Sequence, residues 1–175
     1  EILIFNDSVY DSNGASPSYL EIYNPNTNAI NLNNFYIANN DDADSSIGLA
    51  EFSEIPGLSY LIIDISSLVS LDLINNGSGS MYLFFGDDIK DSITFGAQAN
   101  NYSIGRNAGD LTWSLNYPTP GEINQVAPLG NTSGLKINEW LANTNEINEN
   151  EFIELVNFTK FPVNLSGVSL SDSTD

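Results

Sequence analysis

An acidic loop holds the residues best suited to bind a metal ion. Asp41, Asp42 and Asp44 lie close together in the chain, and Asn39 and Asn40 precede them. Calcium takes about six to eight oxygen ligands from carboxylates, carbonyls and water, so one such loop could supply several. The spacing matches neither an EF-hand nor a nonapeptide calcium repeat. Two interpretations therefore stay open, a calcium site and an acidic loop that is simply solvated.

The absence of histidine and cysteine limits the chemistry that this chain can perform. Nucleophilic catalysis of the Ser-His-Asp or Cys-His type needs an imidazole, and thiolate metal sites need cysteine. Asp87 and Asp88 form a dense carboxylate pair, but a glycosidase needs two carboxylates that face each other across a cleft. We therefore expect no enzyme, no catalytic residue and no cofactor-binding residue, apart from calcium at the acidic loop.

The charge balance excludes several classes of partner. The chain has four basic and 23 acidic residues, which gives a net charge of −19. Nucleic acids and anionic membrane surfaces both attract cationic side chains, so neither is an expected partner. The longest apolar runs, Tyr60–Ile63 and Met81–Phe85, are too short for membrane insertion as a helix. Acidity, abundant asparagine and serine, and scarce lysine favour a secreted bacterial protein, extracellular or on the cell surface.

Short strands dominate the pattern of apolar residues. Runs of Ile, Leu, Tyr, Phe and Val alternate with polar residues, and clusters of turn-forming residues interrupt them about every eight to twelve positions. This pattern predicts an all-β sandwich of two sheets over one core. Ile65–Ile74 fits either a short helix or an irregular crossover. The expected strands are Ile2–Phe5, Tyr19–Tyr23, Phe35–Ala38, Tyr60–Ile63, Met81–Phe85, Ser92–Phe95 and Tyr102–Ile104.

One strand shows how the two faces of a sheet would differ. Leu20 and Ile22 point to one side, and Tyr19, Glu21 and Tyr23 point to the other. The first side suits the core. The second tolerates water at its polar tips.

An internal repeat relates the two ends of the chain. One constant shift along the sequence places residues 19–24 on residues 152–157, and residues 2–4 on residues 135–137, without a gap. The acidic loop then corresponds to the segment that contains Asp172 and Asp175. We predict a complete domain over residues 1–126, a linker over residues 127–133 and the start of a second domain over residues 134–175. Because that second segment repeats only the first third of a domain, we expect either that the chain continues or that its strands pair with another chain.

Three motifs follow one another in the last part of the chain. They are residues 135–140 (Leu-Lys-Ile-Asn-Glu-Trp), residues 151–157 (Glu-Phe-Ile-Glu-Leu-Val-Asn) and residues 163–172 (Val-Asn-Leu-Ser-Gly-Val-Ser-Leu-Ser-Asp). In this order they resemble the opening of a bacterial lamin tail domain. Residues 1–126 carry the same opening with departures, Phe5-Asn6 in place of Asn-Glu and Asn33-Asn34 in place of Ser-Gly. Segments similar to the rest of the family follow at Ile55-Pro56-Gly57, Gly86-Asp87-Asp88, Lys90-Asp91-Ser92-Ile93, Ser103-Ile104-Gly105-Arg106, Trp113 and Thr119-Pro120-Gly121.

The resemblance implies an immunoglobulin-like β-sandwich in tandem copies, and two functions stay open. In bacteria this family is typically an accessory module of secreted or surface proteins, beside nucleases, hydrolases or other repeats. The first function is a non-catalytic structural or interaction module, which adheres, spaces or assembles by strand pairing with other chains or further repeats. The alternative is an accessory glycan- or protein-binding domain attached to a secreted hydrolase or nuclease. Aromatic residues such as Tyr23 and Trp113 could form a platform for glycan.

Overall fold

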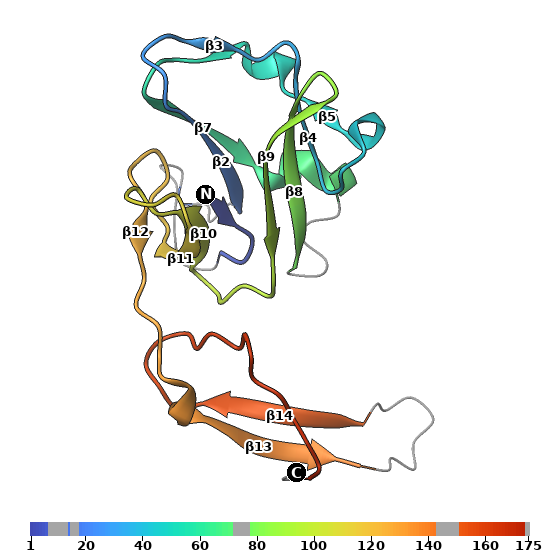
Figure 1. Cartoon of the computed structure of the whole chain (residues 1–175), viewed down its shortest axis with the longest axis vertical. Coiled ribbons are helices and arrows are strands. Elements are labelled where there is room, and N and C mark those ends of the chain that lie inside the picture. Colours follow the sequence, from blue (N-terminus) through green and yellow to red (C-terminus); the bar gives the residue numbers. More distant parts are fainter. Residues whose placement is uncertain (7–13, 15–17, 72–77, 143–150, 174–175) are drawn as a thin grey trace. The chain divides into compact units, whose positions relative to one another are not determined.

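The computed structural model describes residues 1–6, 14, 18–71, 78–142 and 151–173, and the chain forms two compact units. Unit 1 comprises Glu1–Ala127 and unit 2 comprises Pro128–Asp175 (Figure 1). Strands joined by loops and short 3₁₀ helices make up both units. None of the helices in the described ranges has the length and apolar character to cross a membrane.

Unit 1 contains two main antiparallel sheets, which confirms the predicted all-β sandwich. The larger sheet has the order β12-β11-β10-β1-β2-β7, the smaller has the order β5-β4-β8-β9, and β3 and β6 form a separate ribbon. The strands are β1 Ile2–Leu3, β2 Tyr19–Asn24, β3 Ile30–Asn31, β4 Phe35–Ala38, β5 Ile47–Gly48, β6 Glu54–Ile55, β7 Ser59–Asp64, β8 Gly79–Phe85, β9 Asp88–Phe95, β10 Ser103–Arg106, β11 Trp113–Tyr117 and β12 Gln125–Val126. The 3₁₀ helices of this unit are η1 Ala43–Ser45, η2 Ala50–Phe52 and η3 Ile65–Leu71.

The two sheets pack face to face over one hydrophobic core. Its buried side chains include Ile2 and Leu20 from the six-stranded sheet and Ile37 and Ile93 from the four-stranded sheet. Ile22 packs against the same cluster, so β2 directs its aliphatic residues inward as its alternation predicted.

Every strand predicted for residues 1–126 is present, with small differences at the ends. The predicted strands do not include the short strands β3, β5 and β6. They also lack β11 and β12, which extend the six-stranded sheet beyond β10. Over residues 65–71 the ambiguous segment forms two 3₁₀ turns that meet at Leu68, where φ is −107° and ψ is 29°. Residues 72–74 of that segment lie outside the described residues.

Unit 2 is a single hairpin of β13 (Leu135–Leu141) and β14 (Phe152–Asn157), preceded by the 3₁₀ helix η4 (Thr132–Gly134). Among the described residues of this unit, no third strand joins the hairpin. The segment expected as a linker, residues 127–133, makes backbone hydrogen bonds within each unit. Ala127 is buried in unit 1 and donates its N–H to Leu115 O at 2.9 Å, while Gly130 donates its N–H to Pro162 O at 2.8 Å in unit 2.

Two asparagine turns recur at corresponding positions of the two units. Asn24 Nδ2 donates to Asn28 O at 2.9 Å, and Asn157 Nδ2 donates to Phe161 O at the same distance. In the second turn, an asparagine side chain accepts the backbone N–H of the residue two positions later. Asn31 Oδ1 accepts from the Asn33 N–H in unit 1, and Asn164 Oδ1 accepts from the Ser166 N–H in unit 2, both at 2.9 Å. Such side-chain bonds satisfy backbone groups locally, so each turn needs little support from the rest of the fold.

The first strands of the two units do not follow the gapless alignment. Glu1 and Glu21 exchange two backbone hydrogen bonds of 2.7 and 3.1 Å, and Glu139 lies opposite Glu154. Because Glu154 is the counterpart of Glu21 in the alignment, Glu139 takes the place that Glu1 has in unit 1. The paired glutamates are 20 residues apart in unit 1 but closer in unit 2, so one shift cannot align both strands. By strand pairing, the counterpart of Glu139 in unit 1 is therefore Glu1, whereas the gapless alignment placed Asn6 there.

Candidate functional site

The acidic loop proposed for calcium lies at the surface of unit 1, around η1. Asp42 Oδ1 accepts the backbone N–H of Asp44 at 3.0 Å, and Asn40 Oδ1 accepts that of Asp42 at 2.9 Å. Asp41, Asp42 and Asp44 are all exposed. Within the described ranges, no three carboxylates are grouped closely enough to hold a metal ion. Calcium binding stays a prediction; Asp172 of unit 2 is also exposed, and Asp175 lies outside the described residues.

A cleft in unit 1 brings together motifs that are far apart in the sequence. Its volume is about 560 Å³, within the range of roughly 300–1,000 Å³ that is typical of ligand sites. Core side chains of both sheets form an apolar floor, whereas the rim is polar and aromatic. The floor includes Ile2, Leu20, Ile22, Met81, Leu83 and Ile93, and the rim includes Tyr23, Tyr60, Asp91, Arg106, Trp113 and Asn124.

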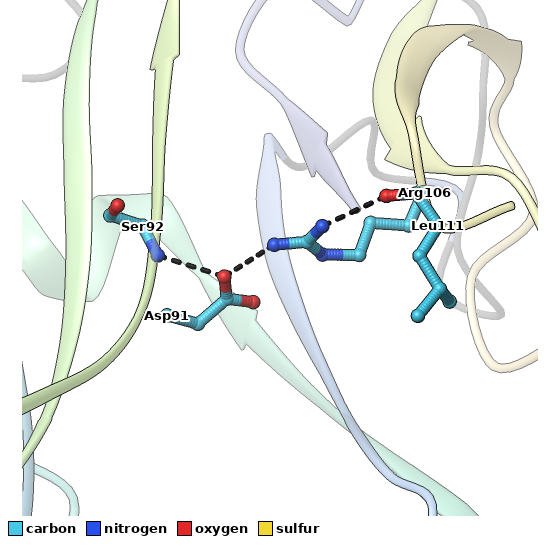
Figure 2. Close-up of polar contacts among 4 residues, drawn as sticks. All are labelled: Asp91, Ser92, Arg106 and Leu111. Atoms are coloured by element: carbon cyan, nitrogen blue, oxygen red, sulfur yellow. Dashed lines mark hydrogen bonds and ion pairs between the residues drawn. The ribbon is translucent and has the colours of Figure 1, made fainter.

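An ion pair joins the two sheets at the rim of this cleft. Figure 2 shows Asp91 on β9 and Arg106 at the end of β10 pointing toward each other, with Arg106 Nη2 on Asp91 Oδ1. Arg106 Nη1 also donates to Leu111 O at 2.9 Å, and the Ser92 N–H donates to Asp91 Oδ1 at 2.8 Å. The guanidinium carbon lies 4.4 Å from the centre of the Trp113 ring. Together these contacts fix the guanidinium in one orientation.

Sequence reasoning did not identify this ion pair as part of a site. Asp91 and Arg106 belong to two separate sequence motifs, and nothing in either motif indicates that the two side chains meet. One signal could have helped, because Arg106 is the only arginine in a chain with 23 acidic residues. A lone arginine in such a chain is expected to find a carboxylate partner.

Two glutamates of the six-stranded sheet, which also line the cleft, form a buried polar cluster. The Glu1 and Glu21 side chains lie beneath the Thr-Pro-Gly motif, and the residues are 7% and 6% exposed. Thr119 donates its N–H to Glu1 Oε1 at 3.1 Å and its hydroxyl to Glu1 Oε2 at 3.3 Å. Gly121 donates its N–H to Glu21 Oε2 at 2.6 Å, and the Ser103 hydroxyl also donates to Glu1 Oε1. At Glu21, the outer face of β2 is therefore covered by this loop.

Burial shifts the pKa of two groups here, Glu21 and Tyr19. It raises the pKa of Glu21 from its ordinary 4.5 to about 7, against the lowering effect of the Gly121 N–H. Burial likewise raises the pKa of Tyr19, which stays protonated in the physiological range. Gly121 has φ +80°, a conformation that favours glycine, so the motif's glycine is needed to present its N–H. The hydrogen bonds from the covering loop hold both carboxyls in place, which suits a structural role.

The matching glutamates of unit 2 have different surroundings. Glu139 and Glu154 are both exposed, and Asn138 Nδ2 donates to Glu154 Oε1. No family model, curated protein or solved structure matches the chain.

Proposed function

We propose that this chain is a non-catalytic structural or interaction module of an extracellular or cell-surface protein, with lamin-tail-like units in tandem. It associates by strand pairing with other chains or with further repeats of the same protein. The observation that carries this proposal is the hairpin of unit 2, whose apolar residues are exposed. The recurring asparagine turns and the paired glutamates support the tandem arrangement.

Apolar side chains of the hairpin are exposed at positions that are buried in unit 1. Trp140 lies opposite Ile153, as Ile2 lies opposite Leu20. Ile2 and Leu20 are 1% and 5% exposed, whereas Trp140 and Ile153 are 71% and 52% exposed. Exposed apolar patches often mark interaction surfaces, and an isolated two-stranded hairpin is marginally stable in water. Burial of this face against further polypeptide would stabilise the unit.

The outer edge of the hairpin supports association through the main chain. β2 pairs with β1 on one side and with β7 on the other, whereas β14 pairs with β13 alone in the described part of unit 2. A free strand edge presents N–H and C=O groups that another strand can bind. The edge and the apolar face together favour a partner that adds at least one strand.

Sedimentation equilibrium of the full chain over a range of concentrations tests this proposal. We expect association that increases with concentration. The double variant Trp140→Lys, Ile153→Lys should weaken it by about tenfold or more, because burial of two charges opposes the contact. The matched control is Leu58→Lys, since Leu58 is an exposed apolar residue of unit 1. A chain that stays monomeric throughout, or equal association of both variants, would contradict the proposal.

The alternative is an accessory module for glycan or protein attached to a hydrolase or nuclease, and the cleft of unit 1 favours it. Tyr23 and Tyr60 line the cleft with ring centroids 4.7 Å apart. Aromatic faces of this kind suit contact with sugar rings. In a Trp140→Phe background, Trp113 is the only tryptophan and reports on the cleft. Soluble oligosaccharides should change its emission, and Tyr60→Ala should abolish the change; a constant emission would count against glycan binding.

A further inference from the structure

The two main sheets of unit 1 end in four edge strands, and one of these differs from the others. The six-stranded sheet ends in β12 and β7, and the four-stranded sheet ends in β5 and β9. Natural proteins protect sheet edges with short strands, charged residues or bulges, because an open edge can pair with another chain. β12 and β5 are two residues long. β9 is longer, but it carries Asp88, Lys90 and Asp91, and its register with β8 shifts between Leu83 and Phe84.

The edge strand β7 lacks these protections over residues 59–63. The whole strand, Ser59–Asp64, pairs with β2 in one continuous register. Residues 59–63 (Ser-Tyr-Leu-Ile-Ile) are uncharged, although the chain has a net charge of −19. Ile62 is 45% exposed, and Tyr60 and Leu61 are half-buried. This edge is therefore uncharged, partly apolar and accessible.

Main-chain groups of Tyr60 and Ile62 point outward from this edge. In an antiparallel ladder, alternate residues direct both their N–H and their C=O to the same neighbouring strand. Directly after β7, Ile65 donates its N–H to Ser18 O at 2.9 Å, next to the start of β2. By alternation, Leu61 also bonds to β2, whereas Tyr60 and Ile62 direct their N–H and C=O away from it. No other strand in the described part of the chain pairs with these outward groups.

A second copy of β7 fits this edge without opposing like charges. When two antiparallel copies overlap over their uncharged residues, Leu61 lies opposite Leu61 of the other copy, and Tyr60 lies opposite Ile62. The outward main-chain groups of Tyr60 and Ile62 then bond to each other. These two side chains share the outer face of the sheet, where an aromatic beside an aliphatic residue stabilises a strand pair. Asp64, the one charged residue of the strand, lies opposite Leu58, so the two Asp64 carboxylates are at opposite ends of the pair.

We propose that two copies of this chain pair through β7, edge to edge and antiparallel, about a two-fold axis at Leu61. The contact is isologous, since the same residues of each copy form it. It joins the six-stranded sheets of the two copies into one continuous sheet. A single strand pair buries less surface than a standard interface, so we expect a weak dimer. The proposal extends the association proposed above to a second surface and does not need the hairpin of unit 2.

Sedimentation equilibrium up to high protein concentration tests this dimer in the full chain. The Trp140→Lys, Ile153→Lys background removes the apolar face of unit 2. In it we expect a monomer–dimer equilibrium that strengthens as salt rises, because salt screens the repulsion between two acidic copies. Ile62→Lys should weaken dimerisation by about tenfold or more, because the two introduced cations lie diagonally across the pair on one face. Ile89→Lys is the matched control and should change nothing, since Ile89 is 49% exposed on the edge strand β9.

Disulfide cross-linking tests the register of the pair. The chain has no cysteine, so one introduced thiol reports one contact. Opposed residues that are not hydrogen bonded to each other lie about 4.5 Å apart between Cα atoms, which is within the range of a disulfide. Leu61→Cys should therefore form a covalent dimer on mild oxidation. Ser59→Cys should not, because Ser59 lies opposite Ile63 of the other copy.

Three results would overturn the proposal: a chain that stays monomeric, a dimer that Ile62→Lys and Ile89→Lys weaken equally, or equal cross-linking of the two thiols. If a monomeric chain shows slower hydrogen exchange of the Ile62 amide when the peptide Lys-Val-Lys-Val-Lys is added, the edge accepts a foreign cationic strand and the second-copy assignment fails. The two proposed associations can also be told apart. If the chain with Trp140→Lys and Ile153→Lys dimerises as strongly as the unchanged chain and Ile62→Lys prevents it, the hairpin proposal fails and this one stands. If that double variant is monomeric while the unchanged chain associates, the reverse holds.

Discussion

The glutamate pairs of the two units share a strand register but have opposite surroundings. Glu1 and Glu21 are covered by a loop that lies 118 and 100 residues further along the chain. Glu139 and Glu154 are exposed. The comparison shows that local sequence sets which residues lie opposite each other, whereas distant segments decide whether they are buried. Four experiments can test that distinction.

The apolar pairs should give the largest contrast. Leu20→Ala should lower the unfolding free energy of unit 1 by about 3 kcal/mol, because it leaves a cavity in the core. Ile153→Ala should change the stability of unit 2 by less than about 1 kcal/mol, since Ile153 is 52% exposed. Urea denaturation measures both, with Trp113 as the probe of unit 1 and Trp140 as the probe of unit 2 in single-tryptophan backgrounds. Equal losses would show that the hairpin is already buried.

The recurring asparagine turn should give the next contrast. Asn24 is 1% exposed, and its Nδ2 also lies 3.0 Å from Ile55 O and from Pro56 O. Asn24→Ala should therefore lower the unfolding free energy by about 2 kcal/mol, because buried carbonyls lose their donor. Asn157→Ala removes only exposed bonds within the turn and should cost about 0.5 kcal/mol. The same denaturation experiments apply, and a large effect at Asn157 would contradict the comparison.

The buried glutamate predicts a particular dependence of stability on pH. Since the pKa of Glu21 is about 7 when folded and near 4.5 when unfolded, the folded state binds more protons between those values. Its contribution to stability is greatest below pH 4.5 and falls as pH rises to 7. Glu21→Gln cannot titrate and keeps an acceptor for the Gly121 N–H. At pH 8 it should stabilise unit 1, by at most about 3 kcal/mol, and near pH 4 the gain should vanish.

Chemical denaturation of unit 1 from pH 4 to pH 8 provides the measurement. Glu154→Gln is the matched control, because it changes the corresponding glutamate in unit 2. It should leave the stability of unit 1 unchanged at every pH. A gain for Glu21→Gln that persists at pH 4 would show a cause other than titration.

The smallest expected effect concerns calcium at the acidic loop. If Asp41, Asp42 and Asp44 bind the ion, calcium at several times its dissociation constant should stabilise unit 1 by about 1 kcal/mol. Asp42→Asn together with Asp44→Asn should remove that gain, whereas Asp172→Asn in unit 2 should not. Thermal unfolding with calcium and with excess chelator distinguishes these results. An unchanged melting temperature would reject the site.

The fold was predictable to the extent that its signals are local. Alternating apolar residues located β2, β4 and β7, and turn-forming residues located the breaks between them. β12 escaped prediction because Gln125–Val126 is too short to show alternation. The gapless alignment failed at the first strand because the spacing between the paired glutamates differs in the two units.

The candidate site was predictable in composition but not in arrangement. The motifs that contain Asp91, Arg106 and Thr119–Gly121 were visible, yet their contacts join strands from different sheets or from opposite ends of the unit. No periodicity in the sequence encodes such contacts. The burial of Glu21 had no local signal for the same reason, since its cover is 100 residues away.

That separation also has a consequence for biosynthesis. During translation the first two strands of unit 1 emerge long before the Thr-Pro-Gly loop that covers their glutamates. At about 5–20 residues per second, the ribosome needs roughly 5–20 seconds to make the intervening 100 residues. For that period the nascent sheet keeps an open acidic face, and its closing contacts have high contact order, which slows folding. Unit 1 therefore cannot complete its fold until the ribosome has made the Thr-Pro-Gly loop near its end.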